Sequence, residues 1–460
     1  MASRMLHDSA LNDLRRKFTG EVLTPDDPAY EETRPVFNAM IDRSPAVIAL
    51  PRNEAEVARA LAYGRTEGLQ IAVRGGGHSV AGNSISDGLV VDLRHMNSVT
   101  VDPGARTVRV GGGATMADLD GATQPYGLAT TGGRVSTTGV GGFVLGGGSG
   151  WLEREFGLAC DNLLAVELVT ADGELVRATG HNNRELFWAL HGGGGNFGVA
   201  TSMTLRLHPL PALTAALLMW PAAAGPEVVR AYRDFMEAAP DQAGGGLIYL
   251  TGGEEPPVPE DLVGKLACAS LITYTGREAE ARDVMAPMLG LGHTGELIGQ
   301  MPYAQVQRML DDPPGYRNYW SAEHLDAFPD EAVDLFCARA HDMVVPSPSQ
   351  HVLFPQGGAV ARGAELYPLP WRSAPWTVHP FGLWEDPADD ARAKEWARGL
   401  REDLRPWTSG AVYLNFIGQE GRDRVVAGFG PENYRRLAAV KAQYDPENVF
   451  RLNHNITPAA

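Results

Sequence analysis

Apolar and polar residues follow two different patterns along the first 208 residues. The segment 53–68 carries apolar residues at helical spacing and starts with Asn53 and Glu56, which resemble a capping box, so a helix is predicted there. Runs of β-branched and apolar residues bounded by turn residues predict strands instead. These strands are expected at 69–73, 88–93, 98–102, 107–110, 163–170, 174–179 and 199–207.

The pattern changes near Pro209, where longer helical stretches and alternating segments replace the short strands. A last segment begins near residue 411. The fold class is therefore predicted to be α+β, with a sheet covered by helices in the middle of the chain. Helices are expected at 226–239, 277–289 and 431–444, and alternating strand-like segments at 349–360 and 376–384.

Composition and charge exclude several classes of protein. The three cysteines, Cys160, Cys268 and Cys337, form no CxxC pair, and the histidines show no ligand spacing, so neither a disulfide scaffold nor a metal site is predicted. The net charge of −17 repels phosphate backbones, which argues against nucleic acid as a partner. No signal-peptide core and no apolar run of ~18–20 residues is found, so a soluble, cytoplasmic protein without a membrane partner is expected.

The 54 glycines exceed the average of about 7% and gather in runs at 75–77, 111–113, 139–148 and 192–198. Because glycine lets backbone approach where a side chain would collide, these runs suggest backbone wrapped closely around a ligand. The first run follows a predicted strand, as in a dinucleotide fingerprint, but the turn-like residues 83–88 behind it exclude a Rossmann helix. Its N–H groups can still bind a diphosphate.

Several motifs, taken in order, resemble one known family. They are 73–83, 89–93, 132–163 (GGRVSTTGVGGFVLGGGSGWLEREFGLACDNL), 187–201 (FWALHGGGGNFGVAT), 413–415, 445–450 and 453–456. Together they resemble the berberine-bridge-enzyme-like oxidases of the vanillyl-alcohol-oxidase superfamily, over nearly the whole chain. This resemblance implies a two-domain PCMH-type FAD-binding fold with an inserted substrate domain of sheet and helices. It implies an FAD-binding domain at 1–208 with its PCMH-type core at 41–208, a substrate-binding domain at 209–410, and a C-terminal return to the FAD domain at 411–460.

The resemblance also assigns cofactor residues. His78 matches the histidine bonded to the flavin 8α-methyl group, and glycines 75–77 with Ser79 match the loop that holds the diphosphate. Val135 stands where many relatives have a second, cysteine link, and Cys160 does not match it. This implies FAD held by one covalent bond, as in the 6-hydroxynicotine oxidases and the enterocin-pathway flavoenzyme. Beside Val135, the implied cofactor contacts are Arg74, Gly75, Gly76, Gly77, Ser79, Gly82, Thr137, Thr138, Gly141, Gly142, Gly198, Val199, Tyr413, Asn415, Asn453 and Asn455.

Three residues, in two parts of the chain, are expected to border the reacting part of the flavin. Thr138 aligns with the residue beside flavin C4a and N5, which governs oxygen access in the family, although a threonine that fills strand space is the alternative. Tyr413 and Asn415 lie two apart on a predicted strand and therefore face the same side. Tyr413 is a candidate acid/base or positioning residue; as a base it requires a lowered pKa or a substrate that supplies the driving force.

The substrate side is less closely defined by the pattern. Tyr249, Gln356 and His379 lie on segments expected to form a sheet over the flavin. The segment 349–360 contains no acid, and Gln356 cannot take up a proton, so a simple base-driven oxidation is in doubt. His379 is a candidate base or a structural histidine. The residues that line an aromatic pocket, or alternatively belong to the core, are Trp151, Trp371, Trp376 and Phe381.

These observations predict an FAD-dependent oxidase, monomeric or homodimeric, that carries out a two-electron oxidation of a small, natural-product-like molecule with O2 as acceptor. The threonine at 138 keeps a flavin monooxygenase open as an alternative. A catalytically silent flavin-binding protein is a second alternative, which any rapid reduction of the flavin by a substrate would eliminate.

Overall fold

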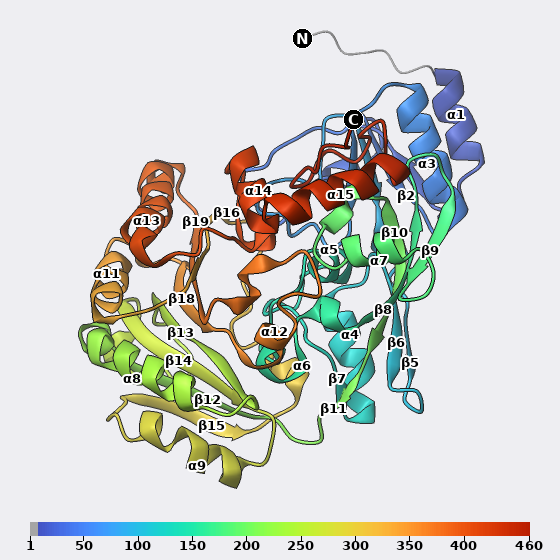
Figure 1. Cartoon of the computed structure of the whole chain (residues 1–460). Coiled ribbons are helices and arrows are strands. Elements are labelled where there is room, and N and C mark those ends of the chain that lie inside the picture. Colours follow the sequence, from blue (N-terminus) through green and yellow to red (C-terminus); the bar gives the residue numbers. More distant parts are fainter. Residues whose placement is uncertain (1–7) are drawn as a thin grey trace.

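The computed structural model describes residues 8–460, and Figure 1 shows its arrangement of sheets and helices. Residues 1–7, part of the segment used to predict the absence of a signal peptide, lie outside the described residues. Within 8–460, no helix is both long enough and apolar enough to cross a membrane. The predicted α+β class is confirmed, because three larger sheets and one two-stranded sheet are combined with covering helices.

The first sheet has four strands and carries the first glycine run at its edge strand. Its order is β1 (Glu21–Leu23), β2 (Val47–Leu50), β4 (Leu89–Asp92), β3 (Ile71–Arg74), with β2, β4 and β3 parallel. Helix α3 (Glu54–Thr66) packs on it. The side chain of Asn53 accepts the N–H of Glu56, as predicted, but the Glu56 carboxylate accepts from Thr19 and Arg52 and not from Asn53. Only half of the predicted capping box is therefore present.

The second sheet is antiparallel and confirms both predicted hairpins. Its order is β5 (Val99–Asp102), β6 (Thr107–Gly111), β10 (Val199–Arg206), β8 (Leu163–Val169), β9 (Leu175–Thr179). One apolar core joins this sheet to three helices and to the end of the chain. The helices are α4 (Met116–Thr123), α5 (Val140–Leu145) and α7 (Arg184–Ala189).

The third sheet has eight strands, all formed by residues 214–384, and every neighbouring pair is antiparallel. Its strands are β12 (Thr214–Pro221), β13 (Ala243–Thr251), β14 (Leu266–Tyr274), β15 (Gly295–Gln300), β16 (Arg317–Trp320), β17 (Glu323–Leu325), β18 (Gln350–Pro355) and β19 (Trp376–Trp384). One face is covered by α8 (Gly225–Ala238), α9 (Glu278–Leu289), α11 (Asp330–Ala340) and α13 (Asp390–Asp403), as Figure 1 shows. The alternating segment predicted at 349–360 is too long, because the strand ends at Pro355. Gly357 and Gly358 have positive φ where α12 (Gly358–Arg362) begins.

The chain then returns to the first two sheets. Helices α14 (Arg422–Phe429) and α15 (Pro431–Tyr444) join the core of the antiparallel sheet, and Arg436 of α15 pairs with Glu185 of α7. The strand predicted around Tyr413 and Asn415 is wrong, because residues 414–416 form a single turn of 3-10 helix. This turn lies between the long sheet and α5, which brings the end of the chain to the glycine runs.

Candidate functional site

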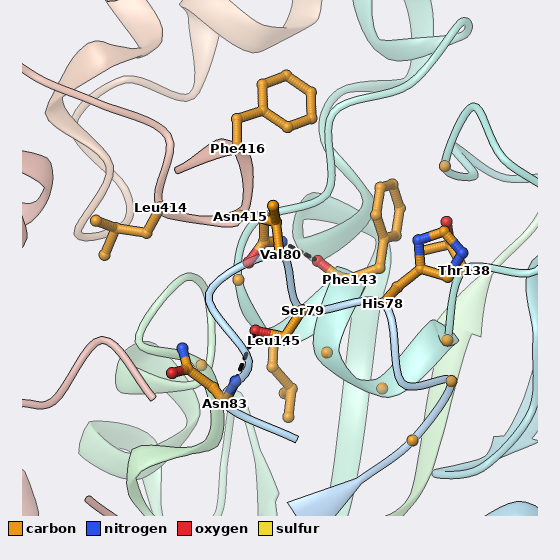
Figure 2. Close-up of a pocket in the computed structure, with 18 of the residues that line it drawn as sticks. His78, Ser79, Val80, Asn83, Thr138, Phe143, Leu145, Leu414, Asn415 and Phe416 are labelled. Atoms are coloured by element: carbon orange, nitrogen blue, oxygen red, sulfur yellow. Dashed lines mark hydrogen bonds between the residues drawn. The ribbon is translucent and has the colours of Figure 1, made fainter. Parts of the chain in front are cut away.

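A cavity lies between the glycine runs and the uncovered face of the eight-stranded sheet. Figure 2 shows part of its wall, where the turn with His78 and Ser79, helix α5 with Phe143 and Leu145, and the turn with Asn415 surround the same space. Backbone forms much of the rest of the wall. The lining glycines are Gly75, Gly76, Gly77, Gly112, Gly133, Gly139, Gly141, Gly142, Gly146, Gly192, Gly193, Gly194, Gly195 and Gly198.

The glycine runs serve two different purposes. A Cβ atom on Gly76 would lie 2.4 Å from the backbone nitrogen of Gly139, so the turn at 75–77 rests directly on the loop at 137–139. Cβ atoms on Gly142, Gly194 or Gly195 would meet no protein atom within 4 Å. Since these three residues line the cavity, the missing side chains leave room for a ligand that lies against bare backbone.

His78 lies at the tip of the first glycine turn, with part of its ring lining the cavity. Its Nε2 atom is 2.7 Å from the hydroxyl oxygen of Thr137, and Phe37 stacks on the ring at a centroid distance of 3.8 Å. Removal from water lowers the pKa of His78 to about 3, so the imidazole is neutral at physiological pH. A neutral ring held on one nitrogen and on one face leaves the other nitrogen available as a nucleophile.

The loop that faces His78 carries the two positions singled out in the sequence. Val135 and Thr138 both line the cavity. Cys160 is fully buried in another cluster, with Leu158, Trp371 and Tyr413, and is not among the lining residues. The arrangement therefore provides valine, and no thiol, on this part of the wall.

Tyr413 and Asn415 are on the same side, as predicted, although the backbone is a turn and not a strand. The Tyr413 hydroxyl oxygen accepts the N–H of Gly148 and of Ser149, at 2.9 and 3.3 Å, and the Nδ2 donor of Asn415 at 2.9 Å. Burial raises the pKa of Tyr413 to about 12, the opposite of what a base at neutral pH requires. Tyr413 is thus suited to positioning the 146–149 loop.

Not all predicted cofactor residues reach the cavity. Gly75, Gly76, Gly77, His78, Ser79, Val135, Thr138, Gly141, Gly142, Gly198, Tyr413, Asn415 and Asn453 line it. Arg74 is buried behind the turn, where it pairs with Asp92, and Val199 belongs to the core. Thr137, Gly82 and Asn455 do not line the cavity either, although the hydroxyl group of Thr137 is hydrogen-bonded to His78, which does. The neighbour of Asn455, His454, lines the cavity instead, and burial lowers its pKa to about 4.

The substrate-side prediction for Tyr249 is corrected by the strand register. Its side chain points to the helix-covered face, where it packs with Phe336 and His351, while its neighbour Ile248 lines the cavity. On β18 the alternation places Gln350, Val352 and Phe354 on the cavity side. The wall of the sheet is therefore formed by residues one position away from the tyrosine that the sequence suggested.

Gln356 lies just beyond the end of β18 and is not a lining residue. Its Nε2 atom is 3.3 Å from the carboxylate of Glu153, which is also paired with Arg134. Arg134 reaches the cavity wall and lies over the rings of Trp151 and Phe354, so its charge is both paired and shielded. Gln356 therefore has a structural role, as a neighbour of the buried Glu153–Arg134 pair.

His379 does line the cavity, as predicted. Its Nδ1 atom donates to the backbone oxygen of Ser321 at 2.7 Å, and Phe416 stacks on its ring at 4.1 Å. Burial lowers the pKa of His379 to about 3, so it remains neutral and is a weak base. Of the four aromatic residues considered, Trp151 and Phe381 line the cavity, whereas Trp371 and Trp376 are core residues.

The sequence reading missed an acidic residue in this part of the cavity. Asp312 lines the wall, and its Oδ1 atom accepts from the Nε2 of Gln350 at 3.1 Å. It lies on a connecting segment after α10 (Tyr303–Val306), outside the strands where an acid was sought. The Asp311-Asp312 pair beside Pro313 is the signal that was available in the sequence.

Comparison with known proteins agrees with this geometry. The FAD binding domain family matches residues 45–179, and the family described as berberine and berberine like matches residues 412–457. The chain is 32% identical to the (R)-6-hydroxynicotine oxidase of Paenarthrobacter nicotinovorans, over 95% of this chain and 97% of that protein. The chain belongs to the berberine-bridge-enzyme-like FAD-linked oxidoreductases.

Solved structures extend the same relationship to the fold. The crystal structure of 6-hydroxy-D-nicotine oxidase from Arthrobacter nicotinovorans superposes with a TM-score of 0.85 and 28% identity, covering 96% of this chain and 98% of the other. Glucooligosaccharide oxidase of Acremonium strictum, which carries a 6-S-cysteinyl, 8α-N1-histidyl FAD, has a TM-score of 0.84 at 21% identity, over 98% of this chain and 100% of that one. The PCMH-type FAD-binding fold is therefore established for this oxidoreductase.

The residues present fit an FAD. The glycine-lined wall offers backbone and open space where Cβ atoms are absent, and the buried Oδ1 atom of Asn453 has no hydrogen-bond partner among the described residues. In this FAD-linked oxidoreductase the glycine turn with His78, α5 and Asn453 would hold the cofactor. When bound, FAD supplies a two-electron acceptor.

Proposed function

We propose that this oxidoreductase is an oxidase that holds FAD through one covalent bond to His78 and oxidises a small organic molecule with O2 as acceptor. The observation that carries the proposal is the His78 ring, which is neutral, stacked on Phe37 and held by Thr137 at the cavity wall. The bond would join a ring nitrogen of His78 to the 8α-methyl carbon in place of a C–H bond. The N–H bond of the imidazole breaks as well, and the two electrons and two protons released pass to O2, which becomes hydrogen peroxide.

A single bond is proposed because the wall around Val135 holds no thiol, and the buried Cys160 packs elsewhere. The histidyl linkage of glucooligosaccharide oxidase and the oxidase activity named for the nicotine-oxidising relative support the proposal by analogy. A natural-product-like substrate and O2 are the proposed partners.

Peptide mapping after acid precipitation tests the linkage. We expect the yellow colour to remain in the pellet and, after proteolysis, to travel with the peptide that contains His78 and not with the one that contains Cys160. A covalent bond survives denaturation, whereas non-covalent FAD is released when the fold is lost. Colour in the supernatant, or on the Cys160 peptide, would contradict the proposed linkage.

A monooxygenase is kept as a second candidate because of Thr138. Thr138 lines the cavity, and Figure 2 shows its side chain near His78. A hydroxyl group at this place can hydrogen-bond to the flavin or to a bound oxygen species, which is why oxygenation is the second candidate.

Labelled oxygen separates the two candidates. For the oxidase we expect 18O2 to appear in hydrogen peroxide and not in the organic product. Thr138→Val, which keeps the volume of the side chain and removes the hydroxyl, should then form peroxide at a rate within about threefold of the wild-type rate, a change of under 1 kcal/mol. Label in the product of the wild type, lost in Thr138→Val, would establish oxygenation instead.

A further inference from the structure

Asp312 is an acidic side chain placed inside an otherwise apolar part of the cavity. It is 7% exposed, it lines the wall, and its Oδ1 atom is held by Gln350 of β18. The Oδ2 atom has no hydrogen-bond partner among the described residues. It is not one of the fully buried atoms that lack a partner, so it is accessible from the cavity. One carboxyl oxygen is therefore anchored and the other is free for a ligand.

The position of Asp312 is fixed from both sides. Its neighbour Asp311 accepts the backbone N–H of Ser136 at 2.6 Å and the Ser136 hydroxyl at 2.5 Å. Ser136 lies between Val135 and Thr138 on the loop that faces His78. The carboxyl of Asp312 is thus tied to the sheet through Gln350 and to the loop beside the cofactor site through Asp311.

The charges around Asp312 favour a neutral carboxyl at rest. Burial, and next the negative charge of Asp311, raise the pKa of Asp312 well above its usual value. From the other elements, Gln350 is uncharged, His379 is neutral, and the charge of Arg134 is paired with Glu153. An acid with a raised pKa is better matched to proton transfer near neutral pH than an ordinary aspartate.

The surrounding wall selects the kind of molecule that can bind. Its side chains are Trp151, Ile248, Trp320, Phe354, Phe381 and Phe416. Aromatic walls favour a flat ring, and ionised Asp312 repels an anionic ligand.

We infer that Asp312 is the proton acceptor of the substrate cavity and that the substrate is an aromatic alcohol. The inference rests on the proposed function for its oxidant. The O–H bond of the substrate breaks and its proton goes to Oδ2 of ionised Asp312. The hydrogen on the adjacent carbon leaves with both electrons of its C–H bond to the flavin, and a C=O bond forms. O2 then takes up the two electrons and two protons as hydrogen peroxide.

Anaerobic reduction of the flavin by arylmethanols, such as 4-methoxybenzyl alcohol, tests the inference across about pH 5 to pH 9. We expect reduction to be fastest at high pH and to fall as the pH drops through the raised pKa of Asp312, because only the carboxylate accepts a proton. Asp312→Asn should slow reduction by about 10²–10⁴-fold and remove this pH dependence. Asp312→Glu should restore part of both.

Two further measurements do not depend on turnover. Infrared difference spectra between low and high pH should show a protonated carboxyl band that is absent from Asp312→Asn. Asp311→Asn removes the neighbouring charge that raises the pKa of Asp312, so the acidic limb of the reduction profile should move to lower pH.

The outcomes separate this inference from the proposed function. An Asp312→Asn enzyme with the rate and pH profile of the wild type overturns the inference, and so does a wild-type flavin that dithionite reduces but no arylmethanol does. Flavin that is released by acid, or reduced flavin that O2 does not reoxidise, contradicts the proposed function. The role of Asp312 is then still decided by the anaerobic reduction rates and by the infrared band.

Discussion

Replacing His78 by alanine is expected to abolish covalent flavin completely. The change removes the imidazole at the end of the glycine turn, which Thr137 holds by its Nε2 atom and which is the proposed point of attachment. The fold should survive, because the ring is only partly buried and contributes one side-chain hydrogen bond, worth about 1 kcal/mol. After acid precipitation, all colour in His78→Ala should be found in the supernatant, whereas the wild type keeps it in the pellet.

His208→Ala is the matched control. His208 is also partly buried and also stacks on an aromatic ring, that of Phe156 at 4.3 Å, but it does not line the cavity. It should lose a comparable amount of stability and keep its covalent flavin. Protein-bound colour that persists in His78→Ala would show that another residue forms the bond, and loss of colour in both variants would point to a general effect on folding.

Sequence reasoning worked where local chemistry decides the structure. The hairpins at 98–110 and 163–179 were predicted from turn residues between β-rich runs, and they form as β5–β6 and β8–β9. The glycine turn with His78 was also found, because a ligand-binding backbone requires a residue type that is visible in the sequence.

It failed where the direction of a side chain depends on distant packing. In β13, apolar residues occupy both faces, so the pattern does not show that Ile248 faces the cavity and Tyr249 the helices. The same limit applies to β18, whose length depends on the positive φ angles of Gly357 and Gly358. A one-residue shift in a strand reverses every side chain, and only tertiary contacts fix the register.

The search for a base shows a second limit. Tyr413 and His379 were candidates because of residue type, but burial moves their pKa values in the directions that make both poor bases. Asp312 lies on a connecting segment with no periodic pattern, and its place beside Gln350 depends on how that segment crosses the cavity. Environment, and not residue type, decides which group can exchange a proton.

The backbone contact between Gly76 and Gly139 should be the part of the cofactor site that is most sensitive to an added side chain. A methyl group on Gly76 would lie 2.4 Å from the nitrogen and 2.6 Å from the Cα atom of Gly139, which are backbone atoms that cannot rotate away. Gly76→Ala must therefore push the His78 turn away from the loop at 137–139. We expect a loss of about 1–3 kcal/mol in the free energy of unfolding, measured with denaturant, and little covalent flavin.

Two other glycines separate strain from a blocked cavity. Gly121 lies in α4 with no atom within 4 Å of its added Cβ, so Gly121→Ala should leave the flavin unchanged and stabilise the helix by about 0.5–1 kcal/mol. Gly142 has equally free space, but that space is the cavity. Because Gly142 is also a helical residue, in α5, Gly142→Ala should be stabilised by a similar amount when FAD is absent, yet incorporate less FAD. If Gly76→Ala kept both its stability and its flavin, the turn at 75–77 and the loop at 137–139 could move apart without a loss of folding free energy. The proposed cofactor site would then not be rigid.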